Sequence, residues 1–269
     1  MKANFINLNP DNLDNEHICC AIGDTKGDPQ AAAKKSWLAQ RFSEGLVFRR
    51  LDARGKVFIE YLPAEAAWAP VTAPGYLHIN CFWVSGQYKG QGLANQLLDY
   101  AIADARAKGK LGLTVISSAK KKPFLSDPGY LKHKGFQVAD QAAPWFELLY
   151  LPLDAGRTAA GQAAEQTAVA ARSPLLPRFK DCCREGRISN PCMTLYYTAQ
   201  CPHTAKYAPL LAELAGSRGQ EFTLIRLDSR EAAQSAPSPA ASYSFFDKGR
   251  FITNEILSEK KFLQYLDQR

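Results

Sequence analysis

The stretch from Val84 to Ala94, Val-Ser-Gly-Gln-Tyr-Lys-Gly-Gln-Gly-Leu-Ala, constrains the fold more than any other part of the chain. It follows an apolar segment, 76–84, that predicts a strand, and it precedes a segment whose apolar residues recur every four positions from Leu93 to Ala105. This spacing predicts a helix that begins in the glycine turn. The first N–H groups of a helix have no partner within it, and the helix macrodipole adds partial positive charge there. The sequence therefore predicts a strand, a tight turn and a helix start that can bind an anion.

The residues of the turn indicate that the anion is a phosphate. Gly90 and Gly92 would let the backbone come close to a phosphate, and Lys89 would add a positive charge. The spacing differs from that of a dinucleotide-binding loop, and no Gly-Lys-Ser/Thr ending is present for a magnesium-bound triphosphate. The alternative is an ordinary strand–turn–helix corner without a ligand.

The same run resembles the pyrophosphate loop of the GNAT superfamily of acyl-CoA N-acyltransferases, with Gly86 and Lys89 where that family commonly has proline and arginine. The resemblance implies a mixed α/β (α+β) fold with a central sheet in which two strands splay, and the pantetheine arm of acetyl-CoA or coenzyme A fills the gap. The resemblance also implies which residues bind the cofactor: Phe82, Trp83, Val84, Gln87, Tyr88, Lys89, Gly90, Gln91, Gly92, Leu93, Ala94, Ser117 and Ser118.

Three polar residues on the predicted strands are catalytic candidates. Glu60 stands among apolar residues of the strand 56–62, and burial in a cleft would raise its pKa towards that of a useful general base. A solvent-facing Glu60 is the equally open alternative. His78 and Asn80 share one face of the strand 76–84, where they could reach an acceptor amine or serve packing alone. An ordered water is a further candidate for the base.

Two other segments bear on the reaction that the resemblance implies. Helices are expected over 11–22 and 29–45, on the acceptor side, which makes candidate contacts of His17, Cys19, Cys20 and Trp37. The tyrosine with which the family often protonates the CoA thiolate falls on Leu131, and Tyr130 would point about 100° away on a helix. The sequence therefore predicts that the thiol leaves as a thiolate or takes a proton from water.

We expect an acyltransferase domain over 1–152, an Ala- and Pro-rich linker over 153–187, and a second domain over 188–269. In the second domain a strand is followed by Cys201-Pro-His-Thr at a helix start, and a terminal hairpin precedes a helix capped by Ser258. This resembles the thioredoxin superfamily, with Thr204 in place of the second cysteine. The helix start is expected to lower the pKa of Cys201. Together the two domains resemble the YoaP-like acetyltransferases.

The leading hypothesis is an acyl-CoA-dependent N-acyltransferase, with acetyl-CoA as the expected donor and a small-molecule or peptide amine as acceptor. The alternative is a monothiol oxidoreductase, or a thiol-dependent binding protein, that acts through Cys201. The net charge of +7 is spread along the chain, which argues against a nucleic-acid partner. The scattered histidines predict no metal site, and the odd number of cysteines, seven, is typical of free thiols in the cytoplasm. No segment predicts a signal peptide or a membrane span.

Overall fold

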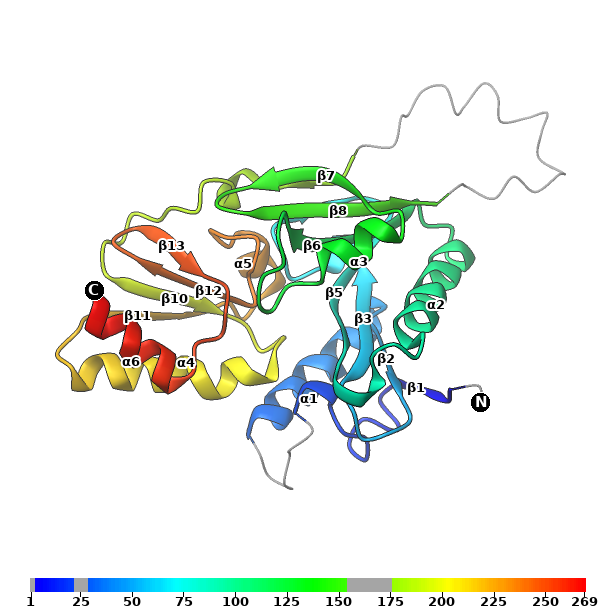
Figure 1. Cartoon of the computed structure of the whole chain (residues 1–269), viewed down its shortest axis with the longest axis horizontal. Helices are drawn as coiled ribbons and strands as arrows, with labels where there is room; N and C mark the ends of the chain where they lie inside the picture. The colour runs from blue at the N-terminus through cyan, green and yellow to red at the C-terminus, as the bar shows by residue number, and fades with distance from the viewer. Residues whose placement is uncertain (1–2, 22–28, 154–175) are drawn as a thin grey trace, which may run out of the picture.

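The computed structural model describes residues 3–21, 29–153 and 176–269, which form two units built on separate sheets (Figure 1). The N-terminal unit has a seven-stranded sheet in which only one neighbouring pair, β5 and β6, is parallel. In sheet order its strands are β1 (Phe5–Leu8), β2 (Val47–Leu51), β3 (Val57–Pro63), β5 (Tyr76–Val84), β6 (Gly112–Ser118), β8 (Phe146–Pro152) and β7 (Gln137–Ala142).

Helices cover both faces of this sheet, because side chains alternate between the faces along each strand. On one face, α2 (Leu93–Ala107) and α3 (Pro128–His133) pack through Leu97 and Leu131 against the Ile59 side of β3. On the other face, α1 (Pro29–Arg41) packs through Leu38 against Phe58 and its neighbours. The apolar stripe predicted from Leu93 to Ala105 is buried, which confirms the helix expected after the glycine turn.

The pairing of β5 with β6 is short. It runs from Tyr76 to Ile79, although β5 continues to Val84 and β6 continues to Ser118. Each strand stays paired on its other side, β5 with β3 and β6 with β8, so the opening lies between β5 and β6 alone. This confirms the prediction of a mixed sheet with two splayed strands.

The C-terminal unit has a four-stranded sheet of order β11 (Phe222–Arg226), β10 (Met193–Tyr197), β12 (Tyr243–Asp247) and β13 (Arg250–Thr253). Only β10 and β11 are parallel. Its helices are α4 (Pro202–Ser217), α5 (Arg230–Gln234) and α6 (Glu259–Gln268). The Ser258 side chain accepts a hydrogen bond from the backbone N–H of Lys261, which confirms the predicted cap of α6.

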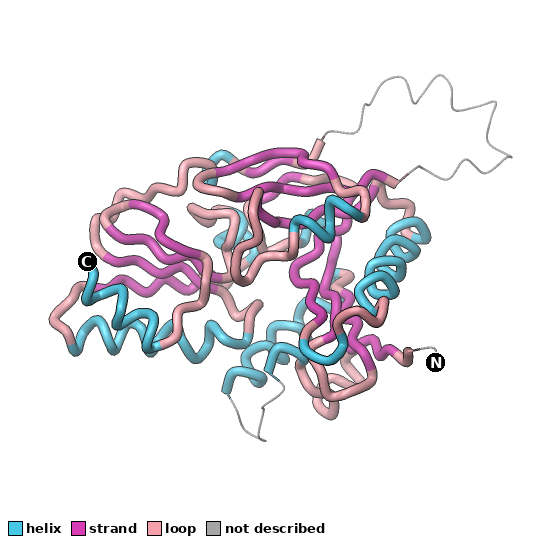
Figure 2. Tube along the Cα trace, in the orientation of Figure 1, coloured by secondary structure: helices cyan, strands magenta, loops and turns pink. Residues whose placement is uncertain are grey.

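The two units pack side by side (Figure 2), with α4 against α1. Part of the predicted linker joins the N-terminal unit: β9 (Arg178–Phe179) pairs with β4 (Val71–Thr72), and the Phe179 ring is buried. Arg184 forms an ion pair with Asp140 of β7 at 2.7 Å. Residues 154–175 of that linker lie outside the described residues.

The helix expected over 11–22 is wrong as far as the structure describes that segment. Residues 9–16 form hydrogen-bonded turns, in which the Asn9 side chain accepts bonds from the backbone N–H groups of Asp11 and Asn12. Asparagine side chains compete in this way with helical bonds. A short 3₁₀ turn, η1 (Cys19–Ala21), follows. Further 3₁₀ turns are η2 (Phe42–Glu44), η3 (Ala64–Ala66), η4 (Gly86–Tyr88) and η6 (Asp181–Cys183).

Across residues 3–21, 29–153 and 176–269, no helix has the length and apolar character that a membrane span requires.

Candidate functional site

The glycine turn between β5 and α2 leaves open space above its backbone. Gly90 and Gly92 have φ values of 78° and 74°, in the left-handed region, and Gly92 caps the start of α2. A Cβ built on either residue would meet no described atom within 4 Å. The first N–H groups of α2 and the exposed Lys89 thus border a space that an anionic group can enter.

The remaining residues of the turn hold it in place. The Gln91 side chain donates a hydrogen bond to the Gln87 carbonyl at 2.6 Å. The Tyr88 ring lies over Gly55 in the β2–β3 turn, so closely that a Cβ there would lie 2.2 Å from the ring. Leu93 is buried in the core. Tyr88 and Leu93 therefore serve the turn by packing, and the contacts predicted for them with a cofactor stay predictions.

Ser117 and Ser118 end β6 at the splayed gap, and both are fully buried. Their hydroxyls donate hydrogen bonds of 2.7 Å to the carbonyls of Ser126 and Lys120, respectively. They thus fix the loop that follows β6. The contact of these serines with a cofactor stays a prediction.

Tyr130 lies at the gap, which the sequence did not predict. Its hydroxyl lies 3.1 Å from the Asn95 side chain in the first turn of α2, and its ring packs edge-on against Phe82 of β5 at 5.7 Å. Leu131, at the position of the family's tyrosine, is buried in the core. Burial, with a contribution from Asp99, raises the Tyr130 pKa to about 12, so the phenol stays protonated at neutral pH. The family motif gave no signal for Tyr130, because the motif places its tyrosine one position later, at Leu131.

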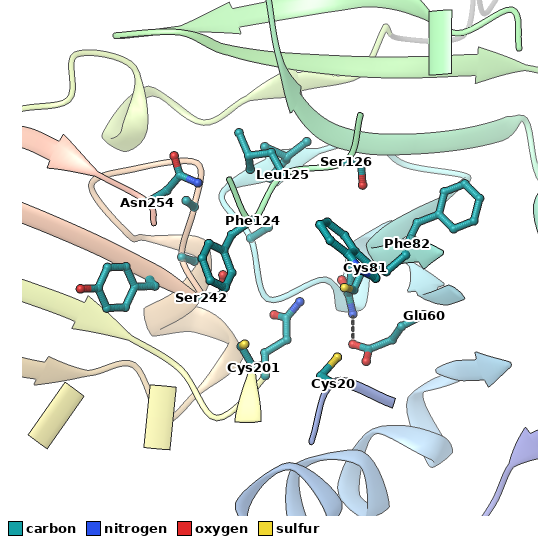
Figure 3. A pocket seen from close by; sticks show the side chains of 18 of the residues that line it. Cys20, Glu60, Cys81, Phe82, Phe124, Leu125, Ser126, Cys201, Ser242 and Asn254 are labelled. Atoms are coloured by element: carbon teal, nitrogen blue, oxygen red, sulfur yellow. Dashed lines mark hydrogen bonds between the residues drawn. The ribbon is translucent and has the colours of Figure 1, made fainter. Parts of the chain in front are cut away.

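A cavity of about 400 Å³ lies where the two units meet (Figure 3). One end reaches β5 and the end of β6 at Phe82 and Ile116. The other end is lined by the start of α4 and the segment before β12. The cavity brings together the four residues predicted as catalytic: Glu60, His78, Asn80 and Cys201.

Glu60 faces this cavity and not the solvent, since it is only 1% exposed. One carboxylate oxygen accepts a hydrogen bond from the Lys34 ammonium at 2.6 Å, and the other accepts one from the Asn80 amide at 3.0 Å. Lys34 is equally buried and lies 4.1 Å from the Trp37 ring centroid. The sequence did not single out Lys34. The only signal was its place one helical turn before Trp37, on the buried face of α1.

His78 is buried beside Thr114, with 3.0 Å between its Nδ1 and the threonine hydroxyl. Burial lowers the His78 pKa to about 4, because an apolar environment disfavours the charged imidazolium. The ring is therefore neutral at physiological pH. It is a weaker base than the sequence alone suggested.

Three thiols from distant parts of the chain also line the cavity: Cys20 of η1, Cys81 of β5 and Cys201 at the start of α4 (Figure 3). The expectation that the helix start lowers the Cys201 pKa is wrong, since burial outweighs the backbone hydrogen bonds and raises it to about 12. Contact with Cys81 and burial raise the Cys20 pKa as well. Within the described residues, no three His, Cys, Asp or Glu side chains are arranged to hold a metal ion.

The residues near the N-terminus that were predicted to contact the acceptor lie in different places. Cys20 lines the cavity, whereas Trp37 is buried in the core, where its ring meets Trp68 edge-on at 5.8 Å. His17 is not part of the cavity lining. The Cys19 side chain lies outside what the structure describes.

The chain was compared with known families and proteins. Residues 66–143 match a family model for the acetyltransferase (GNAT) domain, and residues 221–264 match the YoaP-like model. The chain is 43% identical over 263 residues to a Bacillus subtilis (strain 168) protein named uncharacterized N-acetyltransferase YoaP, covering 98% of both chains.

Solved structures similar to this chain include acetyltransferases. An N-acetyltransferase from Staphylococcus aureus Mu50 is 20% identical, with a TM-score of 0.39, over 58% of this chain and 100% of that one. A GNAT acetyltransferase from Brucella melitensis, solved in complex with acetyl-CoA, is 13% identical, with a TM-score of 0.35, over 56% of this chain and 87% of that one. The family match and the full-length relative confirm the predicted enzyme class, so the chain belongs to the YoaP-like N-acetyltransferases of the GNAT superfamily.

Proposed function

We propose that this enzyme transfers the acetyl group of acetyl-CoA to a primary amine by direct attack within a ternary complex. The observation that carries the proposal is the gap between β5 and β6, which opens beyond Ile79 beside the glycine turn and leads into the cavity. Family membership supports the same chemistry.

The residues present fit coenzyme A. Its phosphates would meet the N–H groups at the start of α2, with Lys89 adding charge, over the open space above Gly90 and Gly92. The pantetheine arm would lie along β5 from Phe82 to Val84. Bound there, acetyl-CoA supplies an activated acyl group whose thioester faces the cavity.

The proton movements follow from the groups in place. The nitrogen of the neutral amine forms a bond to the carbonyl carbon, the carbon–sulfur bond breaks, and the nitrogen loses one proton. Glu60 is the one carboxylate among the described residues of the cavity lining, and it is our candidate acceptor for that proton, with Lys34 and Asn80 holding it in position. The protonated hydroxyl of Tyr130 at the gap is our candidate donor to the departing thiolate. His78, neutral and buried, also lines the cavity.

We further propose that the C-terminal unit is thioredoxin-like and acts as a wall of the acceptor cavity. Its chain order, β10–α4–β11–α5–β12–β13–α6, and the single parallel pair of its sheet support this architecture. Cys201 faces the cavity as a protonated thiol, which favours a wall over a monothiol oxidoreductase. Among the described cysteines, the six free thiols support a reducing compartment such as the cytoplasm.

The test is product formation by the full chain. Incubation with acetyl-CoA and a panel of primary amines should give an N-acetyl product and free CoA in equal amounts, measured by mass spectrometry. Folded protein that neither binds acetyl-CoA nor forms such a product would overturn the proposal.

A further inference from the structure

The described residues that line the cavity include no unpaired carboxylate. Its one carboxylate among the described residues, Glu60, is paired with the equally buried Lys34. Lys56 stands exposed at the rim and adds positive charge. A further positive charge on the amine would therefore meet no free counter-charge among the described lining residues and would be repelled by Lys56.

The walls of the cavity are mostly apolar. They include the rings of Phe58, Trp68, Phe82, Trp83 and Phe124. The three thiols of Cys20, Cys81 and Cys201 belong to the same surface, since a protonated thiol packs as a small apolar group. Ala240, Ala241 and Ile256 extend it from the C-terminal unit.

Phe124 is held at the cavity in an unusual conformation. Its φ is 58°, in the left-handed region that a bulky residue rarely adopts, and its side chain stays 50% exposed. Hydrogen bonds before and after Phe124 hold its loop in place. The Ser117 hydroxyl donates one to the Ser126 carbonyl, and the Asn254 side chain of the C-terminal unit donates one to the Pro123 carbonyl at 2.8 Å. Strained residues that their surroundings hold in place concentrate at binding sites.

We propose that the acceptor is a compact primary amine whose only basic group is the reacting nitrogen, with an apolar, preferably aromatic, body, and that Phe124 and the C-terminal unit select it. This inference rests on the proposed function and names its substrate class. The cavity joins the thioester end at Phe82 to the wall at Ser242, so one molecule can contact both. A volume of about 400 Å³ suits a small organic molecule.

The experiment measures acetylation of 2-phenylethylamine, spermidine and a lysine-containing peptide by the full chain, with free CoA quantified by chromatography. We expect kcat/KM to be at least about tenfold higher for 2-phenylethylamine than for either polar acceptor, as a fitted apolar pocket allows. Equal or greater rates with spermidine or the peptide would overturn the inference.

Two variants with matched controls test the walls. Phe124→Ala should raise KM for 2-phenylethylamine by about tenfold and leave acetyl-CoA binding unchanged. The control is Val138→Ala, at an exposed apolar residue outside the cavity lining, which should change neither quantity.

Ser242→Asp should lower kcat/KM for 2-phenylethylamine and raise the relative rate with spermidine, because it adds a carboxylate to the cavity. The uncharged control Ser242→Asn should not change the ratio of the two rates.

The failures of the two proposals can be told apart. Acetyl-CoA binding without faster CoA release in the presence of 2-phenylethylamine would overturn the substrate class and leave the cofactor assignment standing. An unchanged KM in Phe124→Ala together with an unchanged kcat/KM in Ser242→Asp would overturn the selecting role of these walls. If the folded wild type does not bind acetyl-CoA, the proposed function itself is overturned.

Discussion

At the scale of single residues, burial controls the chemistry of the cavity. The Lys34 ammonium stabilises the charge of the Glu60 carboxylate, with 2.6 Å between nitrogen and oxygen, in a place from which water is nearly excluded. Breaking such a pair leaves an uncompensated buried charge. The same burial keeps the His78 ring neutral and the Cys201 thiol protonated. The polar groups of the site are thus few, fixed and already engaged.

His78 should make stability depend on pH. Its folded pKa of about 4 lies below the ordinary value of 6.5, so between these values the unfolded chain binds a proton that the folded chain does not. The free energy of unfolding should therefore fall as pH drops through this window, by roughly 3 kcal/mol for this residue alone. Urea unfolding at several pH values measures it. His78→Gln should flatten this part of the profile, and an unchanged slope would contradict the assignment.

Cys201 should react slowly with alkylating agents at neutral pH, because burial raises its pKa to about 12 and only the thiolate is nucleophilic. Cys182 is exposed and serves as the internal comparison, although burial raises its pKa as well. Iodoacetamide labelling followed by peptide mass spectrometry should show Cys182 modified first. Faster labelling of Cys201 would revive the monothiol oxidoreductase hypothesis.

At the scale of elements, local patterns predicted the elements that carry the proposed cofactor site. The strand 76–84 and the helix after the glycine turn have the predicted type and position, because apolar periodicity and glycine act locally. The short segments 5–8 and 178–179 were not predicted as strands. Each is too short to show a period, and each becomes a strand by pairing with a distant segment, β2 for the first and β4 for the second.

Phe179→Ala should test whether β9 is part of the N-terminal unit. Its ring is 1% exposed in the larger core, so the truncation should lower the free energy of unfolding by about 3 kcal/mol. Leu176→Ala, three residues earlier at a side chain that is 56% exposed, should change it by less than about 0.5 kcal/mol. Equal effects of the two changes in urea unfolding would contradict the packing of β9.

At the scale of the whole molecule, one apolar core crosses the boundary between the units. It joins Trp68 and Phe58 of the N-terminal unit to Leu227 and Ala241 of the C-terminal unit. The sequence could predict two domains from their separate patterns, but not the cavity between them, since Cys20, Cys81 and Cys201 meet only through tertiary packing. For the same reason it could predict Glu60 as a candidate and not its partner Lys34.

The shared core predicts a single cooperative unfolding transition for the full chain. All four tryptophans belong to residues 1–152, so their fluorescence reports the N-terminal unit, whereas far-ultraviolet circular dichroism reports both units. The two probes should give the same midpoint in urea. Separated midpoints would show that the units unfold independently and that the cavity wall can detach.

The most direct test of the central claim is acetyl-CoA binding by calorimetry to the wild type, Gly92→Glu and Gly109→Glu. Both glycines have positive φ, 74° and 59°, and both face open space, but Gly92 begins α2 and Gly109 follows its end. We predict that the wild type and Gly109→Glu bind acetyl-CoA alike and that Gly92→Glu binds it more than about a hundredfold more weakly, because its carboxylate repels the phosphates. Equal binding by all three, or none by the folded wild type, would contradict a CoA site at this turn.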